Sequence, residues 1–160
     1  MTEISVGLGE MKFSNDINDV ITAHGLGSCI SVTIYDSRIH LGGMIHIVLP
    51  SIVASSGAIV LERFADTGLP LFIKKFTALG GSLIYSSVKI AGGAYMFKGV
   101  KNDGLGVGHK NIQAVQETLE GLGLKIYNQD IGGTHGRTVK LFIKDGKVVS
   151  RIIGMSEVLL

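Results

Sequence analysis

Residues 29–49 read CISVTIYDSRIHLGGMIHIVL. The first part, Cys29 to Tyr35, alternates with a period of two and is rich in β-branched residues, as is typical of a β-strand. Asp36-Ser37-Arg38 supplies a turn, and the apolar run Leu41 to Leu49, which Pro50 ends, is a second strand. These features predict two adjacent strands joined by a short turn.

Two helices and several more strands are predicted around this strand pair. A helix is expected from Leu61 to Leu79, closed by Gly80-Gly81, and Pro70 either sits in the first turn of a later-starting helix or kinks this one. A second helix is expected from His109 to Leu122, where apolar residues recur at the spacing of one helix face. The remaining expected strands are Ile4–Leu8, Asp19–Ala23, Leu83–Ile90, Lys125–Asp130, Val139–Lys144 and Lys147–Ile153, the last two forming a hairpin around Asp145-Gly146.

This mixture of strands and helices predicts an α+β fold, with layered, sandwich-like β-sheets and the two main helices packed on the outside. The length of 160 residues fits a single domain spanning residues 1–160. With 46% hydrophobic and 18% charged residues, the composition is that of a globular chain and not of a disordered one.

Charge and cysteine content narrow the classes of function. The formal net charge is +2, and no basic run or aromatic-interleaved stripe is present, which argues against nucleic-acid binding. The single cysteine excludes an intramolecular disulfide and suits a reducing cytosol. Residues Met1 to Glu10 lack the apolar segment of a signal peptide, and no run approaches the ~20 apolar residues of a membrane span. We therefore expect a cytoplasmic protein without membrane insertion.

A cysteine and a histidine are the strongest candidates for chemistry. Gly25-Leu26-Gly27-Ser28 precedes Cys29, and the glycines let the backbone turn sharply and leave room at the Cys29 amide. Supported by Gly27 and Ser28, that N–H can point at a developing oxyanion. A nucleophilic cysteine needs a base, and His46 lies on the next expected strand, where pairing would bring the two side chains close. Alternatively, Cys29 is a small buried hydrophobe and His46 a hydrogen-bonded core residue.

Other motifs have simpler structural explanations. Residues Gly104 to Gly108 form a glycine loop before a helix and could cradle a phosphate, but the Lys-Ser/Thr of a P-loop is missing, so a structural turn is favoured. The histidines and the cysteine show no zinc spacing, so no metal is expected. His135 and Arg137 either line a cleft or are exposed loop residues, and Ala91 to Phe97 is either a partner-binding loop or core.

Five blocks, in a fixed order and covering nearly the whole chain, make this sequence resemble the CheD family. They are Gly25-Leu26-Gly27-Ser28-Cys29, Gly42 to Pro50, Lys89 to Phe97, Gly108-His109-Lys110-Asn111-Ile112 and Asp130 to Arg137. The resemblance implies a chemoreceptor glutamine deamidase of bacterial chemotaxis that also binds a CheC-type phosphatase. It implies no metal and no organic cofactor.

The resemblance also implies residue roles. Carried over by motif, Cys29 is the nucleophile and His46 the general base. The family's third catalytic residue is a threonine shortly before the Gly-Leu-Gly-Ser-Cys block; here Ala23 stands at that position, and Thr22 lies one residue further away. A one-residue shift turns a strand side chain to the other face. Either a bulge restores Thr22, or another group orients His46, or activity is weak.

The expected function is therefore cysteine-dependent deamidation of receptor glutamine side chains to glutamate, through a thioester on Cys29 with His46 as base. The alternative from another class is a catalytically weak regulatory module that binds a CheC-type phosphatase and chemoreceptors, which the departure at Ala23 favours. A third interpretation, a nucleotide-binding enzyme, rests only on the glycine loop.

Overall fold

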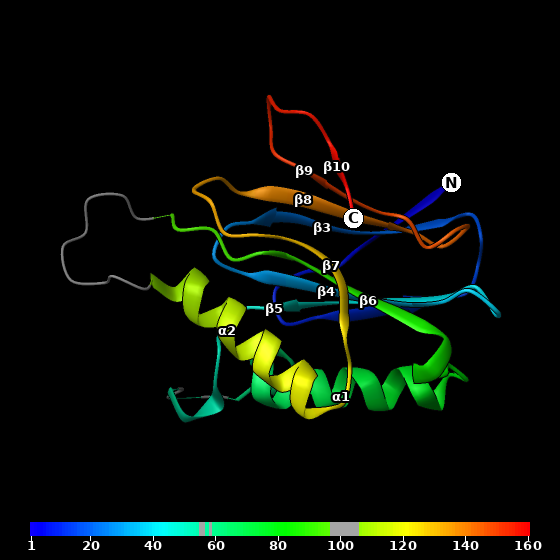
Figure 1. The fold of residues 1–160 in the computed structure, drawn as a ribbon, viewed down its shortest axis with the longest axis horizontal. Coiled ribbons are helices and arrows are strands. Elements are labelled where there is room, and N and C mark those ends of the chain that lie inside the picture. Colours follow the sequence, from blue (N-terminus) through cyan, green and yellow to red (C-terminus); the bar gives the residue numbers. More distant parts are fainter. Residues whose placement is uncertain (55–56, 58, 97–105) are drawn as a thin grey trace.

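The computed structural model of the chain describes residues 1–54, 57, 59–96 and 106–160. Two β-sheets lie face to face, and two helices cover the far side of one of them, which gives three layers (Figure 1). We call the sheet without helices the outer sheet and the sheet next to the helices the middle sheet. The predicted α+β arrangement, with layered sheets and two main helices on the outside, is confirmed.

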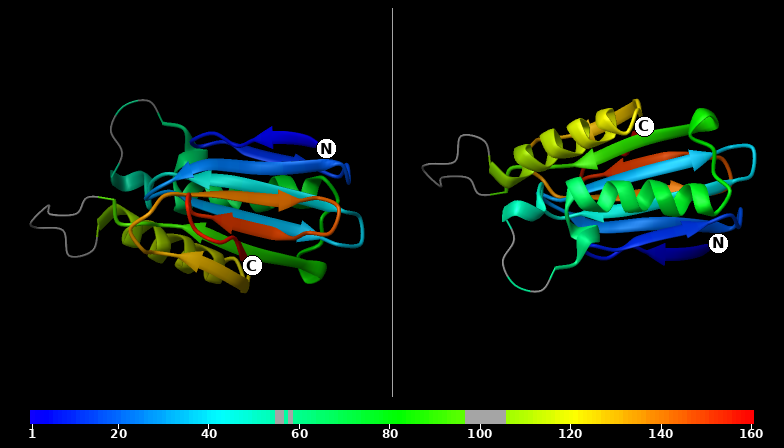
Figure 2. Two further views of the ribbon diagram at one scale, coloured as in Figure 1. Left: turned by 90° about the horizontal axis from the view of Figure 1, so that it is seen from above. Right: turned by 90° about the horizontal axis from the view of Figure 1, so that it is seen from below.

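Each sheet has five strands. The outer sheet consists, in spatial order, of β1 (Thr2–Ser5), β3 (Asp19–Leu26), β8 (Arg137–Phe142), β9 (Val148–Arg151) and β10 (Val158–Leu159). The middle sheet consists, in the same sense, of β2 (Met11–Ser14), β5 (Leu41–Ile47), β4 (Ile30–Asp36), β6 (Ser86–Gly92) and β7 (Ile126–Ile131). Figure 2 shows the helices α1 (Ala65–Ala78) and α2 (Gly106–Gly121) side by side across the middle sheet.

Two hydrophobic clusters hold the layers together. The cluster between the middle sheet and the helices includes Ile30, Val32, Ile34, Leu69, Phe72, Val115 and Leu119. The cluster between the two sheets includes Ile21, Ala23, Leu26, Met44, Ala91, Val139 and Leu141. Because successive side chains of a strand point to opposite faces, Ser31 and Thr33 of β4 face the outer sheet.

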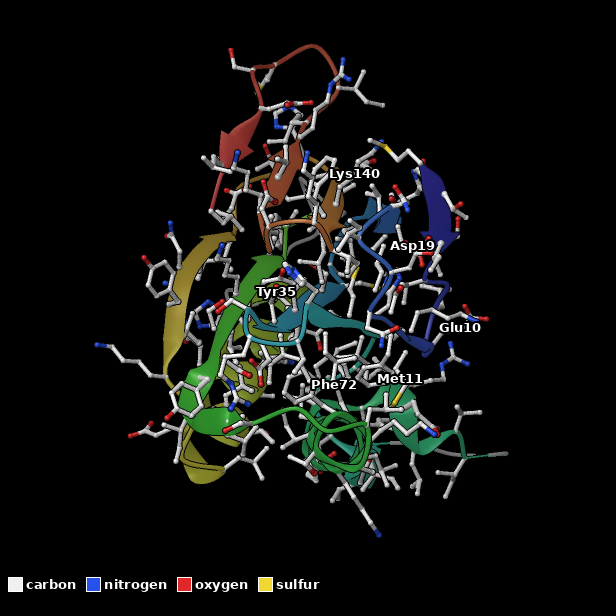
Figure 3. The ribbon with its side chains drawn as sticks, turned by 90° about the vertical axis from the view of Figure 1, so that its right-hand side faces the viewer. Glu10, Met11, Asp19, Tyr35, Phe72 and Lys140 are labelled. Carbon is white, nitrogen blue, oxygen red and sulfur yellow. The ribbon has the colours of Figure 1, made fainter. Side chains whose placement is uncertain are left out.

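The layers are visible end-on in Figure 3, with Lys140 on the outer sheet, Tyr35 between the sheets and Phe72 beside α1. The Tyr35 hydroxyl donates a hydrogen bond of 2.8 Å to the carbonyl of Ile143, just after β8, and so ties the two sheets together. The ring of Phe72 stacks on Phe13 of β2, with 5.2 Å between the ring centroids. Side chains therefore join the three layers at the end of the molecule that faces the viewer in Figure 3.

Most predicted elements are present, with shifted ends. The strand pair of residues 29–49 is β4 and β5, paired antiparallel from Ile30–Ile47 to Asp36–Leu41, and β8 and β9 form the predicted hairpin. The helix expected from Leu61 is interrupted, because Phe64 is extended and bridges to Leu49. A 3-10 turn over Leu61–Arg63 therefore precedes α1, and Pro70 lies inside that helix.

Three further differences concern element ends and short strands. The strand expected from Leu83 starts as a 3-10 turn, and β6 begins only at Ser86. The short edge strands β2 and β10 were not expected. The glycine loop lies outside the described residues as far as Leu105, as does Phe97, and α2 begins at Gly106 instead of His109.

Candidate active site

Cys29 lies where the chain crosses from one sheet to the other. β3 ends at Leu26 in the outer sheet and β4 begins at Ile30 in the middle sheet, so only Gly27, Ser28 and Cys29 make the crossing. The Cys29 side chain is partly buried and packs against the cluster between the sheets. The candidate nucleophile therefore sits at the seam of the two sheets.

The backbone on both sides of Cys29 is fixed to the end of β6. The Gly93 N–H donates to the Cys29 carbonyl at 2.8 Å, and the Ala94 N–H donates to the Gly27 carbonyl at 2.9 Å. Gly92 has a φ of 121°, and a Cβ built there would lie 2.1 Å from the Cys29 oxygen. Glycine is required at this position because a side chain would be strained and would collide with the carbonyl.

His46 is buried and held through one ring nitrogen. The imidazole is only 2% exposed, and its Nδ1 lies 3.2 Å from the Val6 carbonyl oxygen. Because a carbonyl can only accept, Nδ1 carries the hydrogen and Nε2 keeps its lone pair. Nε2 is also buried and makes no hydrogen bond to any described residue. The ring is therefore oriented with a free basic nitrogen, as a general base requires.

The strand register places Cys29 and His46 on one face. His46 lies directly opposite Ser31 in the β4–β5 pair, and Ser31 faces the outer sheet. Cys29 precedes Ser31 by two residues and so shares this face, in agreement with its packing. Cys29 lies one residue before the first pair of this ladder, Ile30 with Ile47, and so sits at the end of β4 that adjoins His46.

Burial favours the neutral form of both groups. It raises the pKa of the Cys29 thiol, an effect that the positive charge of Arg63 partly opposes. It lowers the pKa of His46, an effect that the hydrogen bond to Val6 and the charge of Glu10 partly oppose. The two shifts have the same physical cause, because burial disfavours the charged form of a thiol and of an imidazole alike.

Thr22 lies on the opposite side of the outer sheet. Ala23 belongs to the cluster between the sheets, so its neighbour Thr22 points to the outer face, opposite Lys140 in the β3–β8 pair. The β3 bulge falls between Ala23 and Leu26, after Thr22, and leaves its direction unchanged. The structure does not bring Thr22 together with His46.

The other residues named from the sequence have defined places. The Ser28 carbonyl is bound by Asn111, and a Cβ at Gly27 would lie 3.1 Å from Met96. Arg137 is buried, and its guanidinium donates to the carbonyls of Gly92, Asp130 and Gly132, which makes it a structural residue. His135 is exposed. A Cβ at Gly108 would lie 2.4 Å from the Ala94 carbonyl, so this glycine allows α2 to pack closely.

Two contributors to the site were missed in the sequence. The Val6 carbonyl orients His46, and a backbone atom leaves no residue-type signal. Arg63 is exposed, yet it is linked twice to the chain segment of His46. Its carbonyl accepts from the Val48 N–H, and its side chain packs against Gly9, whose N–H donates to the His46 carbonyl. In the sequence, Arg63 is only a single arginine near an apolar run. This pattern is too common to identify it as a site residue.

Among residues 1–54, 57, 59–96 and 106–160, no three His, Cys, Asp or Glu side chains gather to hold a metal ion. The helices in the described part of the chain are too short or too polar to cross a membrane.

Comparison with known proteins gives one consistent family. Residues 48–152 match the family model described as CheD chemotactic sensory transduction. The chain is 40% identical over 154 residues to a Clostridium acetobutylicum protein named "Probable chemoreceptor glutamine deamidase CheD", covering 96% of this chain and 92% of that protein. Proteins of the same name from Pyrococcus horikoshii and Thermococcus kodakarensis are 35% and 36% identical, over 99% and 98% of this chain and 98% and 97% of their own lengths.

Proposed function

This chain belongs to the CheD family, and from that premise we propose that it deamidates glutamine side chains of chemoreceptors, with Cys29 as nucleophile and His46 as general base. The observation that carries the mechanism is the buried imidazole, held through Nδ1 with Nε2 free, on the same sheet face as the chain's only thiol. The substrate would be a glutamine carboxamide on a receptor segment, met in the cytoplasm.

The first half-reaction forms a thioester. Because thiol and imidazole both start neutral, the Cys29 proton moves to Nε2 of His46 as the sulfur bonds to the carboxamide carbon. The carbonyl oxygen becomes an oxyanion, which the Cys29 backbone N–H would bind, supported by the turn at Gly27 and Ser28. The imidazolium then returns the proton to the carboxamide nitrogen, the C–N bond breaks, and ammonia leaves.

The second half-reaction releases glutamate. His46, neutral again, takes a proton from a water molecule whose oxygen attacks the thioester carbonyl. The C–S bond breaks, and the sulfur regains its proton from the imidazolium. In sum, one water is consumed and one ammonia released for each amide converted to an acid. Each of these proton transfers uses Nε2 and none uses a cofactor.

We propose that the Val6 carbonyl, and not Thr22, orients the base. The family's threonine position is occupied by Ala23, whose methyl group cannot accept a hydrogen bond. The carbonyl of Val6 already accepts from Nδ1 of His46 and is held in place, because the Val6 N–H donates to the Thr22 carbonyl at 2.8 Å. This acceptor fixes the ring tautomer, because a carbonyl can only accept a hydrogen bond.

The test is mass mapping of a cognate receptor fragment incubated with the protein. Cys29→Ala should abolish the amide-to-acid mass change. His46→Asn keeps a donor for the Val6 carbonyl but has no basic nitrogen, so it should fold normally and lose ~10²–10⁴-fold in rate. Deamidation at the wild-type rate by Cys29→Ala would refute the mechanism.

A second candidate function is a regulatory module that binds a CheC-type phosphatase and chemoreceptors with little catalysis. Ala23 in the threonine position and the burial that raises the pKa of the Cys29 thiol favour it. Equal binding of the receptor fragment by wild type and Cys29→Ala, with deamidation by neither, would support this module and exclude the enzyme.

A further inference from the structure

Asn111 of α2 bridges the two strands that carry the proposed catalytic pair. Its side chain is fully buried, and its Nδ2 donates to the Ser28 carbonyl at 2.8 Å and to the Val48 carbonyl at 2.9 Å. A side-chain amide nitrogen has two hydrogens, so both are used. Ser28 immediately precedes Cys29, and Val48 lies two residues beyond His46.

The bridge lies where the sheet ladder stops. The last pair between β4 and β5 is Ile30 with Ile47. Beyond it the strands part, since the Val48 N–H donates to the Arg63 carbonyl instead of to the β4 side. Past this point the carbonyls of Ser28 and Val48 would lack the hydrogen bonds that a neighbouring strand supplies. Asn111 donates a hydrogen bond to each of them instead. One side chain thus continues the ladder by one step, next to the nucleophile.

Helix packing alone does not explain an asparagine at this position. The buried residues of α2 include Asn111, Val115 and Leu119, which lie four residues apart and form one stripe toward the middle sheet. The other two are apolar, as that stripe requires. The Oδ1 of Asn111 is buried and has no partner among the described residues, which is a cost that only the two donor contacts offset.

We propose that Asn111 is a positioning residue for the deamidation, an inference that rests on the proposed function. A peptide unit is planar and trans, so a fixed Ser28 carbonyl also fixes the opposite direction of the Cys29 N–H. Asn111 thereby sets the orientation of both the sulfur-bearing residue and the proposed oxyanion donor. By holding Val48 with the same nitrogen, it sets the spacing between the Cys29 segment and the strand of His46.

The test compares Asn111→Ala with Val115→Ala, which removes buried side-chain volume from the same face of the same helix. Asn111→Ala should lower kcat by about 100-fold with little change in KM, because a small misplacement of reacting groups costs a factor of this size. Val115→Ala should lower the melting temperature and leave kcat unchanged. A wild-type kcat for Asn111→Ala, or an equal loss for Val115→Ala, would overturn the proposal.

A second readout does not depend on deamidation. At a pH where the thiol is fully ionised, Cys29 of Asn111→Ala should react with iodoacetamide several-fold faster than in the wild type, because the crossing segment is released, while Val115→Ala should match the wild type. Equal labelling rates in all three proteins would refute the positioning role of Asn111. An inactive wild type combined with fast labelling of Asn111→Ala would refute the proposed function alone. If Asn111→Ala does not fold, Asn111→Ser keeps one donor, and should show an intermediate effect on both readouts.

Discussion

Titrating Cys29 with an alkylating reagent separates a buried neutral thiol from a preformed thiolate. Burial raises the pKa of this thiol, and the charge of Arg63 only partly opposes the rise. A cysteine with an unshifted pKa of about 8.5 is only ~3% ionised at pH 7. Because the thiolate is the reactive species, the free protein should react at pH 7 at less than ~3% of its plateau rate, with a midpoint above about pH 8.5.

The assay is intact-mass measurement of iodoacetamide adducts over a series of pH values. The chain has one cysteine, so each adduct reports Cys29 alone. Arg63→Gln removes the charge that lowers the pKa and should move the midpoint upward by no more than ~0.7 on the pH scale, because exposed charge pairs contribute at most ~1 kcal/mol. Arg63→Lys should keep the wild-type midpoint, and Arg151→Gln, at an exposed arginine of β9, is the matched control.

His46 should determine the acid side of a second pH profile, that of the deamidation rate. The base must be neutral to accept the thiol proton, and burial lowers its pKa. Deamidation should therefore appear as the pH rises through a midpoint below about 6.5, the ordinary value for histidine. A labelling rate already at its plateau at pH 7 would mean that a thiolate–imidazolium pair exists before substrate binds, and would refute the neutral-pair mechanism.

Three further outcomes are expected. Ala23→Thr should leave kcat within about twofold and cost ~1–3 kcal/mol of stability, because the site is fully buried and the base already has an acceptor; a many-fold rise in kcat contradicts this. Gly92→Ala should lose activity and stability through its contact with Cys29, whereas Gly132→Ala, with φ of 81° and nothing within 4 Å, should cost only the ~1–2 kcal/mol of a left-handed backbone. The pKa of Asp36 is lowered to about 2 by Arg38. The ionised carboxylate should therefore stabilise the fold fully above the unfolded pKa of 3.8, and this stabilisation should be lost as the pH falls toward 2. Urea unfolding at several acidic pH values should show the difference in unfolding free energy between wild type and Asp36→Asn shrinking as the pH falls.

Local patterns were sufficient for the strands whose two faces differ. In residues Cys29 to Tyr35, side chains of two kinds alternate along the strand. One face meets the helices and the other meets the outer sheet, so the two faces carry different residue types. The short strand β2 could not be predicted, because Met11 to Ser14 is defined by its pairing with β5 and not by its own period. The interruption at Phe64 likewise depends on its bridge to Leu49, which is a tertiary contact.

The candidate site divides in the same way. Cys29 and His46 could be predicted because motifs identify side chains. The Val6 carbonyl was not, because any residue type could supply it, and only the loop geometry shows that it faces Nδ1. Asn111 falls between these cases. A polar residue in the buried stripe of a helix can be recognised in the sequence as unusual. Its two hydrogen-bond acceptors could not be predicted, because they lie in distant segments of the chain.

The partial burial of the lone sulfur also affects how this protein withstands oxidants. Peroxides attack thiolates far faster than thiols, and a sulfenic acid formed at Cys29 would find no second cysteine in the chain with which to form a reversible disulfide. Burial raises the pKa of this thiol and so favours the protonated form, which protects the proposed nucleophile from oxidation. The seam between the two sheets thus limits oxidation of the Cys29 sulfur as well as holding it in place.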